Sequence, residues 1–173
     1  MACNITITGR GVPCRDAIGG VRRFWVKTFE EDGSNWGAVS SGALTGAAEA
    51  IVLFAFQISK NTGSFVQTIN ANMETGSVFY SQVLEVTIPV MEAGVNAEIA
   101  DLVKAKLCVV VETTNGEKLV MGLLNGVQVT AGTITTGTAP GDLHGYTLTF
   151  TAEEKAPAPV LTGSTNITYT SEA

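Results

Sequence analysis

The stretch Ser77-Val-Phe-Tyr-Ser-Gln-Val-Leu-Glu-Val-Thr-Ile-Pro-Val90 alternates between apolar and polar residues over most of its length. Its apolar set comprises Val78, Tyr80, Leu84, Val86 and Ile88. The intervening polar set comprises Ser77, Ser81, Glu85 and Thr87. Because successive side chains of a strand point to opposite faces, this pattern predicts a long strand with one buried face and one polar face.

The same two-residue period recurs on both sides of this stretch. In Ser64–Met73, the residues Phe65, Ile69, Ala71 and Met73 share one face, which only Gln67 interrupts. In Tyr146–Thr151, aromatic and aliphatic residues alternate with threonines. Two continuous apolar runs, Ile51–Phe56 and Leu107–Val111, predict central strands covered on both faces. The chain is therefore expected to be rich in β structure.

Turn signals and one helix complete the predicted fold. Asn115-Gly116 and Asn125-Gly126 favour tight hairpins, since both residue types tolerate positive φ. An apolar stripe of Ile99, Leu102 and Val103 predicts a helix over Asn96–Ala105, with Asn96 as its cap. We expect a mainly β fold, a sandwich or barrel-like meander of about seven strands with one flanking α-helix.

The domain organisation follows from composition along the chain. Residues 1–161 form one predicted β-rich domain, within which residues 31–50 are rich in Gly, Ala and Ser and are expected to form a long loop. Residues 162–173 are polar and have few apolar anchors. This tail is predicted to be either disordered or ordered only by a neighbour.

The surface composition admits two interpretations. Charged residues make up only 15% of the chain, whereas soluble domains usually contain about a quarter. Either part of the uncharged surface is buried against neighbouring molecules, or the chain is simply a threonine-rich β domain. Residues 1–27 hold five of the ten lysines and arginines, so the rest of the chain carries the acidic excess. This uneven distribution of charge along the sequence suits contact between the basic part of one copy and the acidic part of the next. Alternatively, folding brings basic and acidic segments together, and their charges average out.

The sequence contains no pattern of residues typical of a catalytic, metal or cofactor site. His144 is the only histidine, and the three cysteines lack Cys-x-x-Cys spacing, so no catalytic, metal or cofactor site is predicted. Glu153-Glu154 is an adjacent pair whose side chains would point to opposite faces of a strand. The longest apolar run, Ile51–Phe56, is far shorter than the roughly 20 residues that span a bilayer, so no membrane partner is expected. The chain is not expected to be an enzyme.

The aromatic residues bear on two possible binding functions. Phe24 and Trp25 follow Arg22 and Arg23, a grouping that single-stranded nucleic acid would accept, yet the rest of the chain is acidic. A β-sandwich module that binds carbohydrate or a cell surface would need exposed aromatic side chains on which a ligand can stack. The chain has only two tryptophans, Trp25 and Trp36, for this purpose.

Several stretches carry a resemblance to a known family. These are Cys14-Arg-Asp-Ala-Ile-Gly-Gly-Val-Arg-Arg-Phe-Trp25, Leu123-Leu-Asn-Gly-Val-Gln-Val-Thr-Ala-Gly132, Gly137-Thr-Ala-Pro-Gly-Asp-Leu-His-Gly-Tyr-Thr-Leu-Thr-Phe150 and Glu153-Glu-Lys-Ala-Pro157. They resemble segments of phage virion structural proteins, and the set of predicted elements resembles the tail tube proteins of tailed bacteriophages. Another virion protein, such as a capsid decoration, head-fibre, tail terminator or completion protein, is the alternative.

The resemblance implies a structural subunit that assembles with itself. Six copies would close into a ring, and rings would stack into a tube through which DNA leaves the capsid. The partners implied are further copies of the chain and other phage tail or virion proteins, with DNA only as non-specific passing cargo. The protein would reside in the virion tail after assembly in the host cytoplasm.

Candidate residues for this role follow from charge. A wall that repels phosphate lets DNA slide, so a lumen lined by Thr, Ser and Glu rather than Lys is expected. The lumen candidates are Glu85 and Thr87, or alternatively the face with Thr147, Thr149 and Thr151. The subunit-interface candidates are Arg10, Arg15, Arg22, Arg23 and Trp36. Contacts between rings are expected from the 31–50 loop and from the amino-terminal segment.

Overall fold

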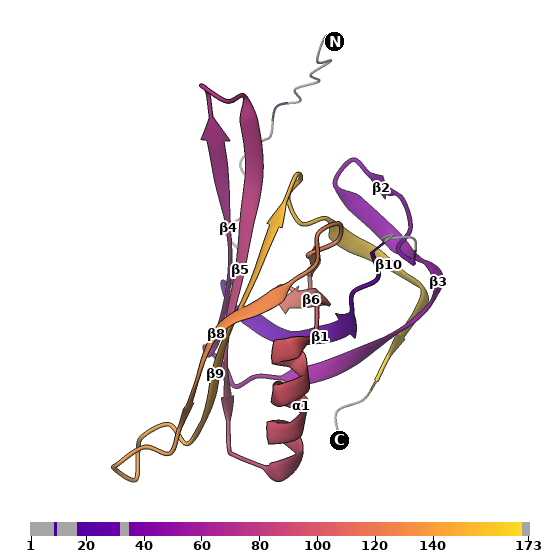
Figure 1. Ribbon diagram of the computed structural model, residues 1–173. Coiled ribbons are helices and arrows are strands. Elements are labelled where there is room, and N and C mark those ends of the chain that lie inside the picture. Colours follow the sequence, from indigo (N-terminus) through magenta and orange to yellow (C-terminus); the bar gives the residue numbers. More distant parts are fainter. Residues whose placement is uncertain (1–8, 10–16, 32–34, 171–173) are drawn as a thin grey trace.

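The computed structural model describes residues 9, 17–31 and 35–170, which form ten strands and one helix in two sheets (Figure 1). The mainly β fold with a single flanking helix is confirmed. The elements are β1 (Val21–Thr28), β2 (Val39–Ser40), β3 (Ala43–Gln57), β4 (Gly63–Asn72), β5 (Ser77–Pro89), α1 (Ala93–Lys104), β6 (Leu107–Thr113), β7 (Lys118–Met121), β8 (Gln128–Thr135), β9 (Gly145–Glu154) and β10 (Val160–Tyr169).

The first sheet closes on itself. Its strand order is β1-β6-β7-β10-β3-β2, and β1 also pairs with β3, so all strands except β2 complete a small barrel. Its interior is a cluster of Trp25, Trp36, Leu44, Ala47, Ile51, Leu53, Cys108, Val110, Val120 and Leu161. Because side chains alternate, the other face of β1 and β6 is free to pack on the second sheet.

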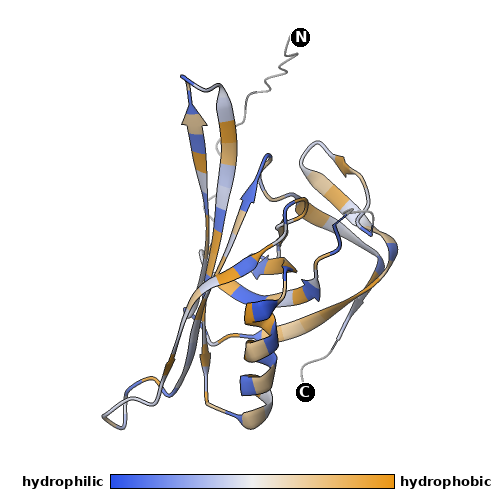
Figure 2. Ribbon diagram, viewed as in Figure 1, coloured by the Kyte–Doolittle hydropathy of each residue, from blue (hydrophilic) through white to orange (hydrophobic). Residues whose placement is uncertain are grey.

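The second sheet has the order β4-β5-β9-β8, and all of its pairings are antiparallel. One face packs against the barrel in a shared core. Phe24 of β1 anchors this core: its ring stacks on Phe56 at 5.2 Å between centroids and lies 5.7 Å from Phe150 of β9. Apolar and hydrophilic residues alternate along the long β4–β5 hairpin, which rises beyond the barrel (Figure 2).

Helix α1 lies beside the lower part of the core and begins three residues before the predicted start. Ile99 is buried and Leu102 is half-buried, as the stripe predicts, but Val103 is 52% exposed. Asn96 does not cap the helix, whose first flanking residue is Glu92. Its Oδ1 instead accepts a hydrogen bond from the Tyr146 hydroxyl at 2.6 Å, which ties the helix to β9.

The predicted long loop over residues 31–50 is wrong over its second half, since β2 and the first part of β3 occupy it. Small residues are required there because β3 and β10 approach closely. A Cβ on Gly46 would lie 2.8 Å from the Thr165 carbonyl oxygen, and a Cβ on Gly163 would lie 2.2 Å from that of Thr45. The Gly-rich composition therefore reflects packing of two strands rather than a loop.

The tail over residues 162–173 is also corrected, because residues 162–169 belong to β10 and no neighbour is needed to order them. β10 runs parallel to β3, with Ile167 opposite Ile51 and Tyr169 opposite Leu53. The ring of Tyr169 packs 5.0 Å from that of Trp25. The few apolar residues of the tail are thus sufficient because β3 supplies a long pairing edge.

Of the turn and strand predictions, one of each kind is confirmed and one is not. Asn115-Gly116 forms the β6–β7 turn, where Gly116 has a φ of 88°. Asn125-Gly126 instead lies in a connection between the two sheets, since β7 and β8 do not pair. The Leu107–Val111 run is buried on both faces, as predicted. The run in β3 is not, because Phe54 is 58% exposed.

Candidate functional site

The outer face of the four-stranded sheet brings together every residue predicted to line a lumen. Glu85 on β5 lies opposite Thr149 on β9, and Thr87 lies opposite Thr147. Thr151 projects from the same face of β9. The sequence left the two strands as alternative walls, whereas the pairing register makes them parts of one wall.

The two rows of outer-face residues, Glu85 with Thr149 and Thr87 with Thr147, continue onto the edge strands, the first onto both β4 and β8 and the second onto β8. Ser64 of β4 lies opposite Glu85, while Ala131 and Thr133 of β8 lie opposite Thr149 and Thr147. Hydroxyl groups and small side chains therefore cross the sheet in these two rows, whereas Val66, Val83 and Phe79 lie on the same face farther along the β4–β5 hairpin. The opposite face of the same strands is mostly apolar and belongs to the core, through Leu84, Val86, Tyr146, Leu148 and Phe150.

The sheet contains no positive charge. None of the ten lysines and arginines of the chain lies in β4, β5, β8 or β9. The carboxylates of Glu85 and Glu153 project from the outer face, whereas Glu154 points to the core side. Lys106 lies at one margin, in a shallow hollow beside Ser81 and Thr151. The middle of the face therefore offers no cation to a phosphate group.

Both edges of this sheet are unpaired among the described residues. No described strand pairs with the outer side of β4 or of β8. Neither strand contains a charged residue or a proline, which are the usual protections of an exposed edge, although β8 has a bulge near Thr130. Ile134 of β8 lies opposite the buried Tyr146 on the core side, yet it is 62% exposed because no strand lies beyond it.

Comparison of this chain with protein-family models, curated proteins and solved structures finds no match. The geometry of the sheet is therefore what bears on function.

The predicted interface residues are dispersed. Arg10 and Arg15 lie outside the described residues. Arg22 is exposed at the start of β1, and Arg23 forms an ion pair with Glu112 of β6 at 3.0 Å. Trp36 is only 8% exposed within the barrel cluster, which overturns its placement on an interface. The indole is held there by the apolar interior of the barrel rather than by a neighbour.

A buried carboxylate was missed by the sequence analysis. Glu154 is 4% exposed, and its Oε1 accepts hydrogen bonds from the backbone N–H groups of Leu124 at 2.9 Å and Asn125 at 2.8 Å. These bonds hold the connection between β7 and β8 against the end of β9. The available signal was the alternation of β9, which places Glu154 on the same face as Phe150 and Ala152.

The remaining reactive residue types are separated from one another. Burial raises the pKa of the Cys108 thiol to about 12, despite the nearby Lys27, so the thiol stays protonated at neutral pH. His144 is exposed in the β8–β9 loop. No group of three His, Cys, Asp or Glu side chains within the described ranges is placed to hold a metal ion. In the same ranges, no helix has the length and apolar character needed to cross a membrane.

Proposed function

We propose that this chain is the structural subunit of a phage tail tube, a virion protein whose copies close into rings, of six in the arrangement we favour, that stack into a conduit for DNA. The observation that carries the proposal is one sheet whose two uncharged edge strands pair with no further described strand and whose hydroxyl-rich face has no cation. Further copies of the chain and other tail proteins are its partners.

The strand directions suit ring closure. Since each pairing in β4-β5-β9-β8 is antiparallel, β8 runs opposite to β4. Rotation about a ring axis keeps the strand direction, so the β4 strand of the next copy arrives antiparallel to β8. The four-stranded sheets then merge into one antiparallel barrel. This closure removes both free edges.

The apolar side chains at the two edges supply a register. On the core side, Phe65 lies on β4 and Ile134 lies on β8. Pairing that places Ile134 beside the Phe65 of a neighbour covers both side chains and continues the core from one copy to the next. A slip by one residue would instead turn Ile134 toward the polar wall. The ring therefore has one favoured register.

The resulting lumen would present the outer face of the sheet. Threonine and serine hydroxyls, together with the Glu85 and Glu153 carboxylates, offer DNA no site at which its counterions would be released. DNA is accordingly cargo that passes, not a ligand that is held. A carbohydrate-binding module has less support, because Trp25 and Trp36 are 4% and 8% exposed and provide no stacking platform.

The experiment is substitution at the β8 edge. Ile134→Lys places a charge on a side chain that is 62% exposed in the isolated subunit, so folding is unaffected while edge pairing becomes unfavourable. Val52→Lys is the matched control, since Val52 is 45% exposed on the barrel strand β3. Light scattering should report rings for the wild type and the control, and monomers for Ile134→Lys. Rings of undiminished yield from Ile134→Lys would reject the proposed interface.

A further inference from the structure

The β4–β5 hairpin has exposed apolar side chains that no other described part of the chain covers. Beyond the barrel, Ile69 is 66% exposed and Val78 is 53% exposed on the core side of the ribbon, and Met73 at the tip is 96% exposed. Asn70 and Ser77 occupy the opposite face together with Phe79, which is 38% exposed. A two-stranded ribbon is marginally stable in water unless it packs on something. A hairpin whose tip exposes Ile69, Met73 and Val78 therefore has the form of a docking element.

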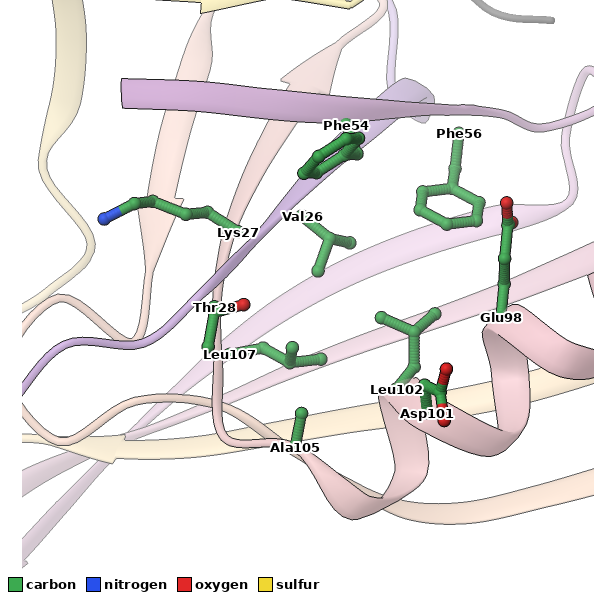
Figure 3. A pocket seen from close by; sticks show the side chains of 10 residues that line it. All are labelled: Val26, Lys27, Thr28, Phe54, Phe56, Glu98, Asp101, Leu102, Ala105 and Leu107. Carbon is green, nitrogen blue, oxygen red and sulfur yellow. The ribbon is translucent and has the colours of Figure 1, made fainter. Parts of the chain in front are cut away.

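A groove at the opposite end of the molecule offers apolar contacts. It lies between α1 and β3 and has a volume of about 320 Å³ (Figure 3). Phe54, Phe56 and Leu102 point into it, and Val26 and Leu107 form its floor (Figure 3). Phe54 is 58% exposed there. The groove thus exposes two phenyl rings.

The β4–β5 turn lies at the top of the ribbon view and α1, which lines the groove, lies at the bottom (Figure 1). The hairpin tip is separated from the base of β4 by ten residues, roughly 30 Å at about 3.3 Å per residue. β3, which carries Phe54, leads directly into that base. Each copy therefore has one apolar projection at one end and one apolar groove at the other.

We infer that the hairpin tip of one copy docks into the α1–β3 groove of a second copy in the next ring, with Met73 as the inserted side chain. This inference rests on the proposed function and names the contact between rings. A projection and a groove on different surfaces make a head-to-tail contact, which propagates along an axis instead of closing. Methionine suits such a site because its flexible thioether packs well on aromatic rings.

The strength of the contact comes from repetition. One side chain in one groove buries far less than the roughly 800 Å² per partner of a stable complex. In a ring, all copies dock together, and the first contact raises the effective concentration for the others. Stacking therefore requires rings, whereas rings do not require stacking.

Charge gives the contact a distinctive salt dependence. Glu98 and Asp101 line the helix side of the groove, and Glu74 follows Met73 at the tip. Lys27, on the β1 side of the groove, forms an ion pair with Glu30 at 2.9 Å. Like charges that approach one another repel, and salt screens this repulsion. Stacking should accordingly increase with ionic strength, opposite to the behaviour of a contact held by ion pairs.

The test compares ring formation with stacking. Met73→Gln and Phe54→Gln should each leave rings intact by negative-stain microscopy but reduce tube length at least several-fold. Phe79→Gln is the matched control, because Phe79 is 38% exposed on the opposite face of the same hairpin. Tubes of normal length from Met73→Gln and Phe54→Gln would overturn the inference and leave the ring proposal standing. Absence of rings from the wild type would overturn both.

Crosslinking provides a second measurement that does not depend on loss of assembly. In a Cys3→Ser, Cys14→Ser background, the double substitution Met73→Cys, Phe54→Cys should give a disulfide-linked ladder of many copies under mild oxidation. Each cysteine alone joins at most two copies and serves as the control. Intact tubes that give no ladder would contradict the docking.

Discussion

Glu85 on β5 lies directly opposite Thr149 on β9, and both side chains project from the face of the four-stranded sheet that turns away from the core. Ser64 and Ala131 extend the same row to the two edge strands. The single carboxylate of this row thus stands among hydroxyl and methyl groups. A surface of this kind repels phosphate weakly and evenly, which is what a conduit for DNA requires.

Thr149→Lys should convert the proposed conduit into a DNA-retaining wall. Each ring would gain one cation per copy in the middle of the face, and phosphate binding would then release counterions. Filter binding of labelled duplex DNA to assembled tubes should show retention that falls steeply as salt rises. Thr168→Lys on the exposed side of β10 is the control and should not retain DNA. Wild-type tubes that hold DNA with a steep salt dependence would contradict the proposed lumen.

Glu154→Ala should destabilise the fold although it removes a charge. The substitution leaves the N–H groups of Leu124 and Asn125 without their acceptor, at a cost of about 1–3 kcal/mol in the free energy of unfolding. Glu153→Ala is the neighbouring control, because Glu153 is exposed and should change stability by less than about 0.5 kcal/mol. Urea unfolding curves compare the two. Equal effects would show that the buried carboxylate does not hold the β7–β8 connection.

Phe24→Ala should be far more costly than a comparable surface change. Phe24 is fully buried between Phe56 and Phe150, at the point where the barrel meets the second sheet. Loss of its ring should lower the free energy of unfolding by about 3–5 kcal/mol. Phe79→Ala, on the exposed hairpin, should cost much less. A loss below about 1 kcal/mol for Phe24→Ala would mean that the two sheets do not share this core.

Asp142 should make the β8–β9 loop sensitive to acid. The backbone N–H of Ala139, followed by the backbone N–H and hydroxyl of Thr138, donates to its Oδ2 and holds the pKa of this carboxyl below its usual range. A depressed pKa means that the ionised form orders the loop. This ordering is complete above the usual value of about 3.9 and is lost as pH falls through the depressed value.

The measurement is an NMR titration of the Thr138 amide. Its midpoint should lie below about 3.9, and the titration should disappear in Asp142→Ala. A midpoint at or above that value would refute the role of these hydrogen bonds.

The sequence predicted the second sheet better than the barrel. Strands such as β5 and β9 have one apolar and one polar face, so alternation alone reveals their existence and their polar faces. The pairing of the two strands, which joins these faces, does not follow from alternation. β3 and β10 lack this signal where they cross, because close approach selects Gly46 and Gly163 at positions that otherwise resemble a loop. Small residues in a tight crossing and small residues in a flexible loop give the same composition.

Residue-level roles were harder to predict where tertiary contacts decide them. Trp36 reads as a surface aromatic in a polar stretch, yet the barrel closes around it. Asn96 has the chemistry of a cap, but the Tyr146 hydroxyl engages its side chain. The partners of both side chains are distant in sequence, so no local pattern contains them.

The most direct test of the account is the mass and symmetry of the purified protein, by light scattering and class-averaged negative-stain images. The purified protein should form rings with a central opening and six-fold symmetry, which lengthen into tubes as salt is raised. A particle that stays monomeric at high concentration, with the edges of β4 and β8 exchanging their amide hydrogens as free strands, would contradict this prediction.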